Sequence, residues 1–207
     1  MMYDAGVDRP SNQGSSRPGR PRSEKATNAI LEAAADLMEE KGFADTTIEA
    51  IAARAQVSKV TIYKWWPSRG AVAIDAYFCR YHQTLDFTDT GDVATDLTTQ
   101  LQLLVDAFRG RAGDIMGELI AEAQRDPALA VALRDGWLQP RRSLTAHVLQ
   151  LAVERGQIRA DINVETLMDQ LYAPVYWRLL MRHQAFDRQL VPSIVDNILR
   201  GVSRLPE

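Results

Sequence analysis

The stretch from residue 46 to residue 69 constrains the fold of this chain most strongly, because two short helical patterns follow each other within it. Thr46 with Glu49 three residues later has the spacing of a capping box, which predicts that a helix begins there. Four apolar residues then fall on one face of that helix: Ile48, Ile51, Ala52 and Ala55. The next two residues break the period, and Ser58 is a favourable N-cap for a second helix. The stretch therefore predicts a helix-turn-helix.

The second helix of this pair has an outer face that suits contact with DNA. Its inward face is supplied by Val57, Ile62 and Trp66. The residues left pointing outward are Lys59, Val60, Thr61, Tyr63 and Lys64. Side chains of these kinds reach base edges and phosphates when such a helix lies in a major groove. We therefore expect double-stranded DNA as a partner.

The region from Ile30 to Ala76 resembles the tetracycline-repressor (TetR) family of homodimeric bacterial transcription regulators. The residues that carry the resemblance are Ile30, Leu31, Ala34, Gly42, Phe43, Thr46, Thr47, Ile51, Ala52, Val57, Ser58, Thr61, Ile62, Tyr63, Trp66, Pro67, Ser68 and Arg69. One departure is Gln56, which stands where such turns usually place Gly. That position commonly needs a positive φ, which strains a residue with a Cβ by roughly 1 kcal/mol. We expect a loss of stability there and no change of fold.

The resemblance implies a role for each outward residue at a pseudo-palindromic operator. The expected phosphate contacts are Thr47, Ser58, Tyr63 and Arg69, two of which stand at helix starts that also favour anions. The expected base readers are Lys59, Val60, Thr61 and Lys64, with Val60 contacting a thymine methyl group. The protein would then be a ligand-responsive transcription factor, and a repressor in particular.

Residues 1 to 22 are predicted to be a basic arm that is disordered when free, because they are rich in Gly, Pro, Ser and Arg and lack a hydrophobic period. The segment from Arg17 to Arg22 resembles the Gly-Arg-Pro core of AT-hook peptides, which lie in the minor groove of A·T-rich DNA. Its predicted DNA contacts are Arg17, Arg20 and Arg22, and the alternative is a solvated tail. The net charge of −3 does not exclude DNA, because basic residues cluster here and between residues 56 and 70.

The rest of the chain is predicted to be all-helical, with about nine helices and no strand. The three-helix DNA-binding domain spans 23–85, beginning at the Ser23 cap, and a second domain for effector binding and dimerisation spans 86–207. Within the second domain, a long helix opens at Asp126 and should be kinked by Pro140.

The last two predicted helices, 164–180 and 190–204, carry unusually wide apolar stripes. In the family, the corresponding helices of two subunits form a four-helix interface, so the resemblance implies a homodimer through them. The alternative is that both helices are buried within one subunit.

Six aromatic or methionine residues stand at helical spacing where they would line an effector cavity: Phe108, Met116, Trp137, Tyr172, Tyr176 and Trp177. Residues of this kind are also common in plain hydrophobic cores. The resemblance implies a small apolar effector among them.

The sequence predicts no enzyme, cofactor or metal site, because its three histidines are far apart and it has no catalytic or phosphate-loop motif. Cys79 is expected to be a small core residue. A single cysteine and the lack of a long apolar run favour a cytoplasmic protein without a membrane span. Two alternatives remain: an architectural DNA-binding protein that acts through the basic arm, and a helical enzyme that uses the C-terminal cavity.

Overall fold

The computed structural model describes residues 24–81 and 89–202, and within them every regular element is helical, as predicted. The elements are α1 (Glu24–Lys41), α2 (Ile48–Arg54), α3 (Lys59–Tyr63), α4 (Arg69–Tyr81), α5 (Val93–Phe108), α6 (Arg111–Ala123), α7 (Pro127–Leu133), the π-helical turn η2 (Arg134–Leu138), α8 (Gln139–Glu154), α9 (Val164–Met181) and α10 (Leu190–Val202). Because α7, η2 and α8 follow one another without interruption, these ranges form nine helical rods. The predicted arm, the Ser23 cap and the boundary near residue 85 lie outside the described residues.

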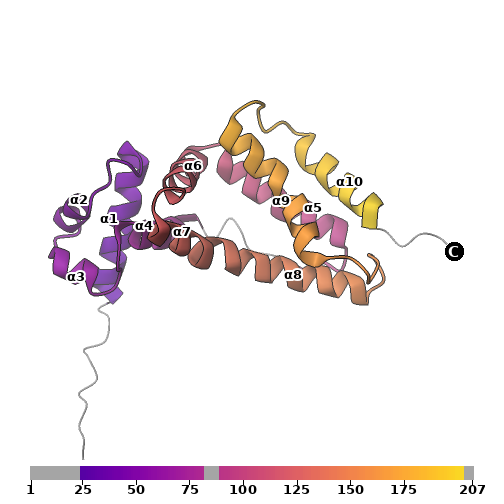
Figure 1. Ribbon diagram of the computed structural model, residues 1–207, viewed down its shortest axis with the longest axis horizontal. Coiled ribbons are helices and arrows are strands. Elements are labelled where there is room, and N and C mark those ends of the chain that lie inside the picture. The colour runs from indigo at the N-terminus through magenta and orange to yellow at the C-terminus, as the bar shows by residue number, and fades with distance from the viewer. Residues whose placement is uncertain (1–23, 82–88, 203–207) are drawn as a thin grey trace, which may run out of the picture.

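The helices form two groups that are joined by a middle layer (Figure 1). The short helices α2 and α3 gather with α1 at one end of the molecule, and α5, α9 and α10 lie at the other. Between them stand α4, α6 and α7, and the rod continues from α7 into α8 along one edge. The helix-turn-helix is therefore carried on α1 and α4.

The N-terminal core is built from α1, the residue after its C-terminal turn, and one face of α4. Ile30, Ala34, Leu37 and Met38 of α1 are buried, and Phe43 closes the core after Gly42 ends the helix at a φ of +86°. On α4 the buried face runs through Val72, Ala73, Ala76 and Tyr77, whereas Phe78 and Cys79 are exposed. The expectation that Cys79 is a core residue is therefore wrong. One or two steps beyond Tyr77 rotate a side chain off the buried face, since each residue turns the helix by about 100°.

The irregularity expected at Pro140 takes the form of the π-helical turn η2. Proline has no N–H to donate and its ring clashes with the carbonyl four residues earlier in a regular α-helix. The turn η2 ends two residues before this proline, and at its end the N–H of Gln139 bonds to the carbonyl of Arg134, five residues back. Gly136 in the same turn lets the rod approach α4 closely, because a Cβ there would lie 2.9 Å from Cγ2 of Ile74.

The two wide apolar stripes predicted at the end of the chain, on α9 and α10, differ in how far they are exposed. On α10 the first part of the stripe is covered within the subunit, where Leu190, Val191, Ile194 and Val195 are buried and the helix packs on α5 and α9. On α9 a buried stripe is accompanied by exposed large apolar side chains: Trp177, Leu180 and Met181. Of the side chains that the structure describes on these two helices, the large exposed apolar ones belong to α9, and Ile198 and Leu199 of α10 are partly buried.

Candidate functional site

The first helix of the helix-turn-helix is capped by Thr47. Its side chain accepts a hydrogen bond from the N–H of Ala50 at 3.1 Å. The predicted capping box that begins at Thr46 is wrong, because the Thr46 side chain is fully buried and its hydroxyl donates to the carbonyl of Gly42 at 2.7 Å. Glu49 instead forms an ion pair with Lys59 at 2.9 Å, which ties α2 to α3.

The turn between α2 and α3 is a Schellman motif with Gln56 in the left-handed conformation. Its φ is +53°, as expected from its place in the resemblance to the family. The N–H of Val57 bonds to the carbonyl of Ala52 at 3.0 Å and that of Gln56 to the carbonyl of Ala53 at 3.3 Å. Ser58 then caps α3 and accepts from the N–H of Thr61 at 3.1 Å, as predicted.

The outward face of α3 is exposed as the pattern predicts. Val60 and Tyr63 are 78% and 54% exposed, whereas Ile62 and Trp66 are buried. Lys64 holds its ammonium group 5.0 Å from the centre of the Trp65 ring. The hydroxyls of Thr61 and Ser58 share a hydrogen bond at 2.9 Å, so the side chains of the face are held by short-range contacts.

Arg69, a predicted phosphate contact, is also a structural residue. Its Nη1 donates to the carbonyls of Phe43 and Ala44 at 3.1 and 3.0 Å, and its guanidinium lies 4.1 Å from the centre of the Phe43 ring. These contacts fasten the connection between α1 and α2 to the start of α4. The three predicted arginines of the arm, Arg17, Arg20 and Arg22, lie outside the described residues.

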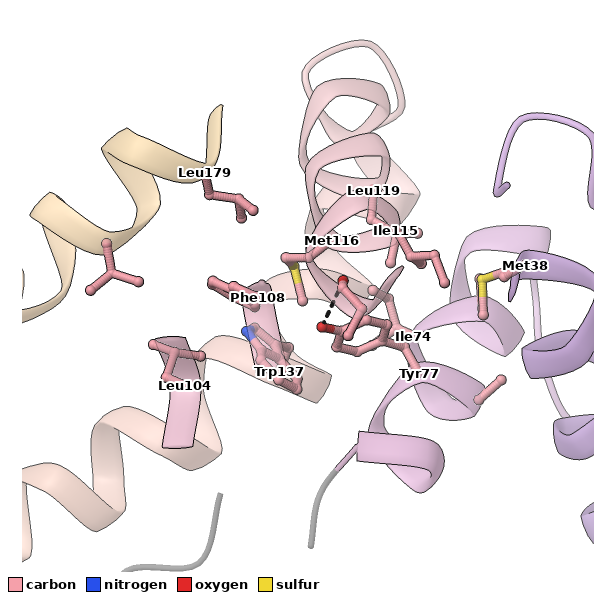
Figure 2. Packing of buried hydrophobic residues seen from close by; sticks show 14 of the residues in the cluster. Met38, Ile74, Tyr77, Leu104, Phe108, Ile115, Met116, Leu119, Trp137 and Leu179 are labelled. Carbon is pink, nitrogen blue, oxygen red and sulfur yellow. Dashed lines mark hydrogen bonds between the residues drawn. The ribbon is translucent and has the colours of Figure 1, made fainter. Parts of the chain in front are cut away.

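The predicted effector residues come together only in part. An apolar pocket of about 270 Å³ lies between α6, η2 and α9, lined by Met116, Ile120, Leu133, Trp137, Leu138, Tyr176 and Leu180. Three of the six predicted residues are in this lining, and Phe108 packs against one of them, with its ring 5.4 Å from that of Tyr176. Figure 2 shows Phe108, Met116 and Trp137 converging from different helices. Tyr172 bonds to Thr145 at 2.7 Å instead, and Trp177 is 58% exposed.

Trp137 lies between this pocket and Arg141, a buried arginine that was not predicted from the sequence. Its Nε1 donates to the Tyr176 hydroxyl at 3.0 Å, and its ring packs edge-on against Tyr77 at 5.0 Å. The guanidinium of Arg141 lies 4.6 Å from the centre of the same ring. The spacing of Trp137, Arg141 and Thr145, each four residues from the next, was the available signal that all three face inward.

The rod also contacts α4, which carries the helix-turn-helix. A Cβ on Gly70 would lie 2.8 Å from Cδ1 and 3.0 Å from Cβ of Leu129, so α7 and α4 touch through a glycine. The Tyr77 hydroxyl donates to the carbonyl of Ala112 at 3.1 Å, which adds α6 to the same junction (Figure 2). The helices that line the pocket are therefore in packing contact with α4, which carries the helix-turn-helix.

A second connection, through α6, was not predicted. Arg111 donates to the carbonyls of Met38 and Glu39 at the end of α1, each at 3.0 Å. Glu118 accepts from the N–H of Phe43 at 2.6 Å. These bonds satisfy backbone groups at the C-terminus of α1, where orphan carbonyls need partners.

Comparison with known proteins gives the family of this chain. The family described as "Bacterial regulatory proteins, tetR family" matches residues 30–76, and "Tetracyclin repressor-like, C-terminal domain" matches residues 87–198. The HTH-type transcriptional regulator YdeS of Bacillus subtilis (strain 168) is 37% identical over 187 residues, which cover 90% of this chain and 94% of that protein. The crystal structure of TetR family transcription regulator SCO0332 is 43% identical, with a TM-score of 0.77, covering 87% of this chain and 100% of that one.

The chain belongs to the TetR family of transcriptional regulators and is a DNA-binding protein. A further relative, the DNA-binding transcriptional repressor TetR of Mycobacteroides abscessus, is 26% identical over 181 residues, or 86% of this chain and 94% of that protein. These relatives are regulators and not enzymes. In the ranges that the structure describes, none of the helices is long and apolar enough to cross a membrane. The same ranges contain no cluster of three or more His, Cys, Asp or Glu side chains that could hold a metal ion.

Proposed function

We propose that the protein is a homodimeric repressor that leaves its operator when a small molecule occupies the pocket at Trp137. The observation that carries this proposal is the packing of the α7–η2 rod on α4. On the rod, Trp137 of η2 forms part of the pocket wall, and Leu129 of α7 packs against α4, the helix that supports α2 and α3. A ligand that moves Trp137 would therefore displace α4.

On the DNA side, we propose that α3 enters a major groove, with the arm of residues 1–22 in the adjacent minor groove. The base readers would be Lys59, Val60, Thr61 and Lys64, and the phosphate contacts Thr47, Ser58, Tyr63 and Arg69. The exposure of Val60 and Tyr63 supports this assignment. Because Lys59 is paired with Glu49, it must exchange that partner for DNA before it can contribute.

On the dimer side, we propose an interface formed by α9 and α10. The exposed apolar side chains of α9 support it, since Trp177 and Met181 are both more than half exposed in the single subunit. A two-fold interface uses the same patch on both partners, so one such helix face is sufficient for self-association. Two subunits would place two copies of α3 on successive turns of the operator.

The response to ligand follows from differential binding. A ligand shifts the protein toward release only if it binds the non-operator conformation more tightly than the operator-bound one. The rigid contact between Gly70 and Leu129 allows little compression, because a glycine has no side chain that could yield. Movement of the rod would therefore reach α4 as a displacement of the whole helix.

The test is footprinting on the DNA that flanks the protein's own gene, combined with sedimentation. We expect a protected pseudo-palindrome, occupied by a dimer, with a preference of at least about 1,000-fold over unrelated DNA. Equal binding to unrelated DNA would instead identify an architectural protein that acts through the arm. A monomer on a single half-site would contradict the proposed interface.

A further inference from the structure

Arg141 on α8 is a buried cation without an acidic partner. Its side chain belongs to a residue that is only 8% exposed, and its Nη2 is buried with no hydrogen-bond partner in the described structure. A buried charge is normally paired or fully hydrogen-bonded, because removing it from water is strongly unfavourable. An unsatisfied guanidinium in a native fold therefore calls for an explanation.

The neighbouring arginine, Arg142, differs from Arg141 because it is paired with acidic side chains. Arg142 bonds to Asp169 at 2.6 Å and also to Glu165, both on α9. Around Arg141, by contrast, burial lowers the pKa of the guanidinium, and the phenols of Tyr176, Tyr172 and Tyr77 oppose this shift only in part. Burial also raises the pKa of Tyr176 and Tyr172, which keeps those phenols neutral. They offer hydroxyl groups and no charge.

The same neighbourhood holds a second incomplete polar group. Gln100 is only 2% exposed, its side chain interacts with Tyr172, and its Oε1 is buried without a hydrogen-bond partner. Tyr172 in turn bonds to Thr145. Two unsatisfied groups around one set of tyrosines indicate a polar site whose partner comes from outside the chain.

The pocket lies directly beside this site. Trp137 and Tyr176 line the apolar pocket, and the same two rings surround Arg141, one stacked on its guanidinium and the other acting on its pKa. The π-helical turn that carries Trp137 ends three residues before Arg141, and such turns are frequent at functional sites. An entering molecule would meet apolar walls first and then the hydrogen bond between Trp137 and Tyr176.

We propose that the effector is an apolar carboxylate, whose hydrocarbon part fills the pocket and whose charged group pairs with Arg141. This inference rests on the proposed function and names the chemical class of its ligand. A monoanion suits the site, because one guanidinium supplies the charge and neutral phenols supply the remaining donors. The carboxylate reaches Arg141 by turning Tyr176 away from Trp137, which loosens the ring that packs against α4. A neutral apolar molecule would fill the pocket and leave the cation unpaired.

The test compares straight-chain carboxylates with their neutral amides, from hexanoate and hexanamide to dodecanoate and dodecanamide, by titration calorimetry on the full-length protein. A charge-assisted hydrogen bond favours the acid by at least about tenfold over an amide of the same length. Arg141→Met removes the charge and retains an unbranched side chain, so it should abolish this preference. The matched control, Arg142→Met, should retain it. Equal binding of acid and amide, a preference that persists in Arg141→Met, or no binding by any of the acids would each overturn the proposal.

A second measurement needs no ligand. Replacing a buried unpaired charge by an apolar side chain of similar length is neutral or stabilising, so Arg141→Met should melt at the same temperature as the unchanged protein or higher. A lower melting temperature would show that Arg141 serves the fold and would overturn the inference.

Operator binding, measured by anisotropy in the same titrations, separates this inference from the proposed function. Carboxylates that bind through Arg141 without releasing DNA would support the anion site and contradict the proposed ligand response. Neutral amides that release DNA as well as the acids do, with no effect of Arg141→Met, would support the response and overturn the anion site.

Discussion

On α3 the polar side chains lie in solvent and are held by neighbours a few residues away, whereas Arg141 lies inside the protein among residues from three helical rods. Ser58 and Thr61 bond to each other, and Lys59 to Glu49 ten residues before it. Arg141 instead meets Trp137 on the same rod, Tyr77 on α4 and Tyr176 on α9. A surface site can thus be built from local chain geometry, but an internal one depends on how whole helices pack.

The difference between the interior and the surface is tested most strongly by replacing Trp137 and Trp177. Trp137→Ala should lower the free energy of unfolding by about 3 to 5 kcal/mol, because it empties a buried site that contacts Tyr77, Arg141 and Tyr176. Trp177→Ala, on the exposed face of α9, should change the stability of the subunit little and weaken the proposed dimer. Urea unfolding and sedimentation measure the two effects. Similar losses of stability in both variants would contradict the difference between interior and surface.

The next largest effect is expected on DNA affinity alone, when the predicted arm of residues 1–22 is removed. Removing residues 1–22 should leave melting and dimerisation unchanged and weaken binding to operators with A·T-rich flanks more than to G·C-flanked ones. The slope of log K against log salt should fall by about 0.9 for each phosphate charge that the protein no longer neutralises, or about 3 to 4 units for a dimer in which each arm neutralises two. Anisotropy at four salt concentrations measures this. Superimposable slopes would identify the arm as a solvated tail.

The reading face should show smaller and sequence-dependent effects. Thr61→Ala and Lys64→Ala should each weaken operator binding by about 1 to 3 kcal/mol, with relaxed specificity at the base pair that they contact. Tyr63→Phe should weaken all operators alike, because a phosphate contact carries no base identity. Circular dichroism serves as the control for folding. If the Lys64 variant lost affinity equally for every operator, Lys64 would contact a phosphate and not a base edge.

The smallest effect, on the free energy of unfolding, is expected at Gln56 in the turn between α2 and α3. Gln56→Gly should raise the free energy of unfolding by a few tenths of a kcal/mol to about 1 kcal/mol, because relief of the left-handed strain exceeds the added entropy of the unfolded glycine. The fixed φ of +53° is the basis of this expectation. A lower melting temperature would mean that contacts of the Gln56 side chain outweigh its backbone strain.

The same contrast explains what could be predicted from the sequence. The cap at Ser58, the left-handed Gln56 and the exposed face of α3 depend on interactions within about ten residues, and all three are found. The choice between Thr46 and Thr47 as the cap could not be made, because it depends on which hydroxyl is buried against the end of α1. Local pattern is sufficient only where a residue's partners are local.

The internal site was predicted in part, for a related reason. Met116, Trp137 and Tyr176 are apolar or aromatic residues at helical spacing, and they do share the pocket. Arg141 was missed because an arginine is expected in solvent, although its four-residue spacing from Trp137 places the two on one face of the rod. The resemblance to the family supplied the arrangement of helices and gave no information on the charge inside them.

The π-helical turn also sets a condition on the length of the chain. A helix that gains one residue within a turn rotates everything beyond it by about 100° relative to everything before it. Leu129 before η2 touches Gly70 on α4, and Thr145 after η2 bonds to Tyr172 on α9, so the two contacts are in phase only with that residue present. Deleting one residue between Arg134 and Leu138 would regularise the helix and turn one contact away from its partner. Under the proposed function, this deletion would uncouple ligand binding from operator binding.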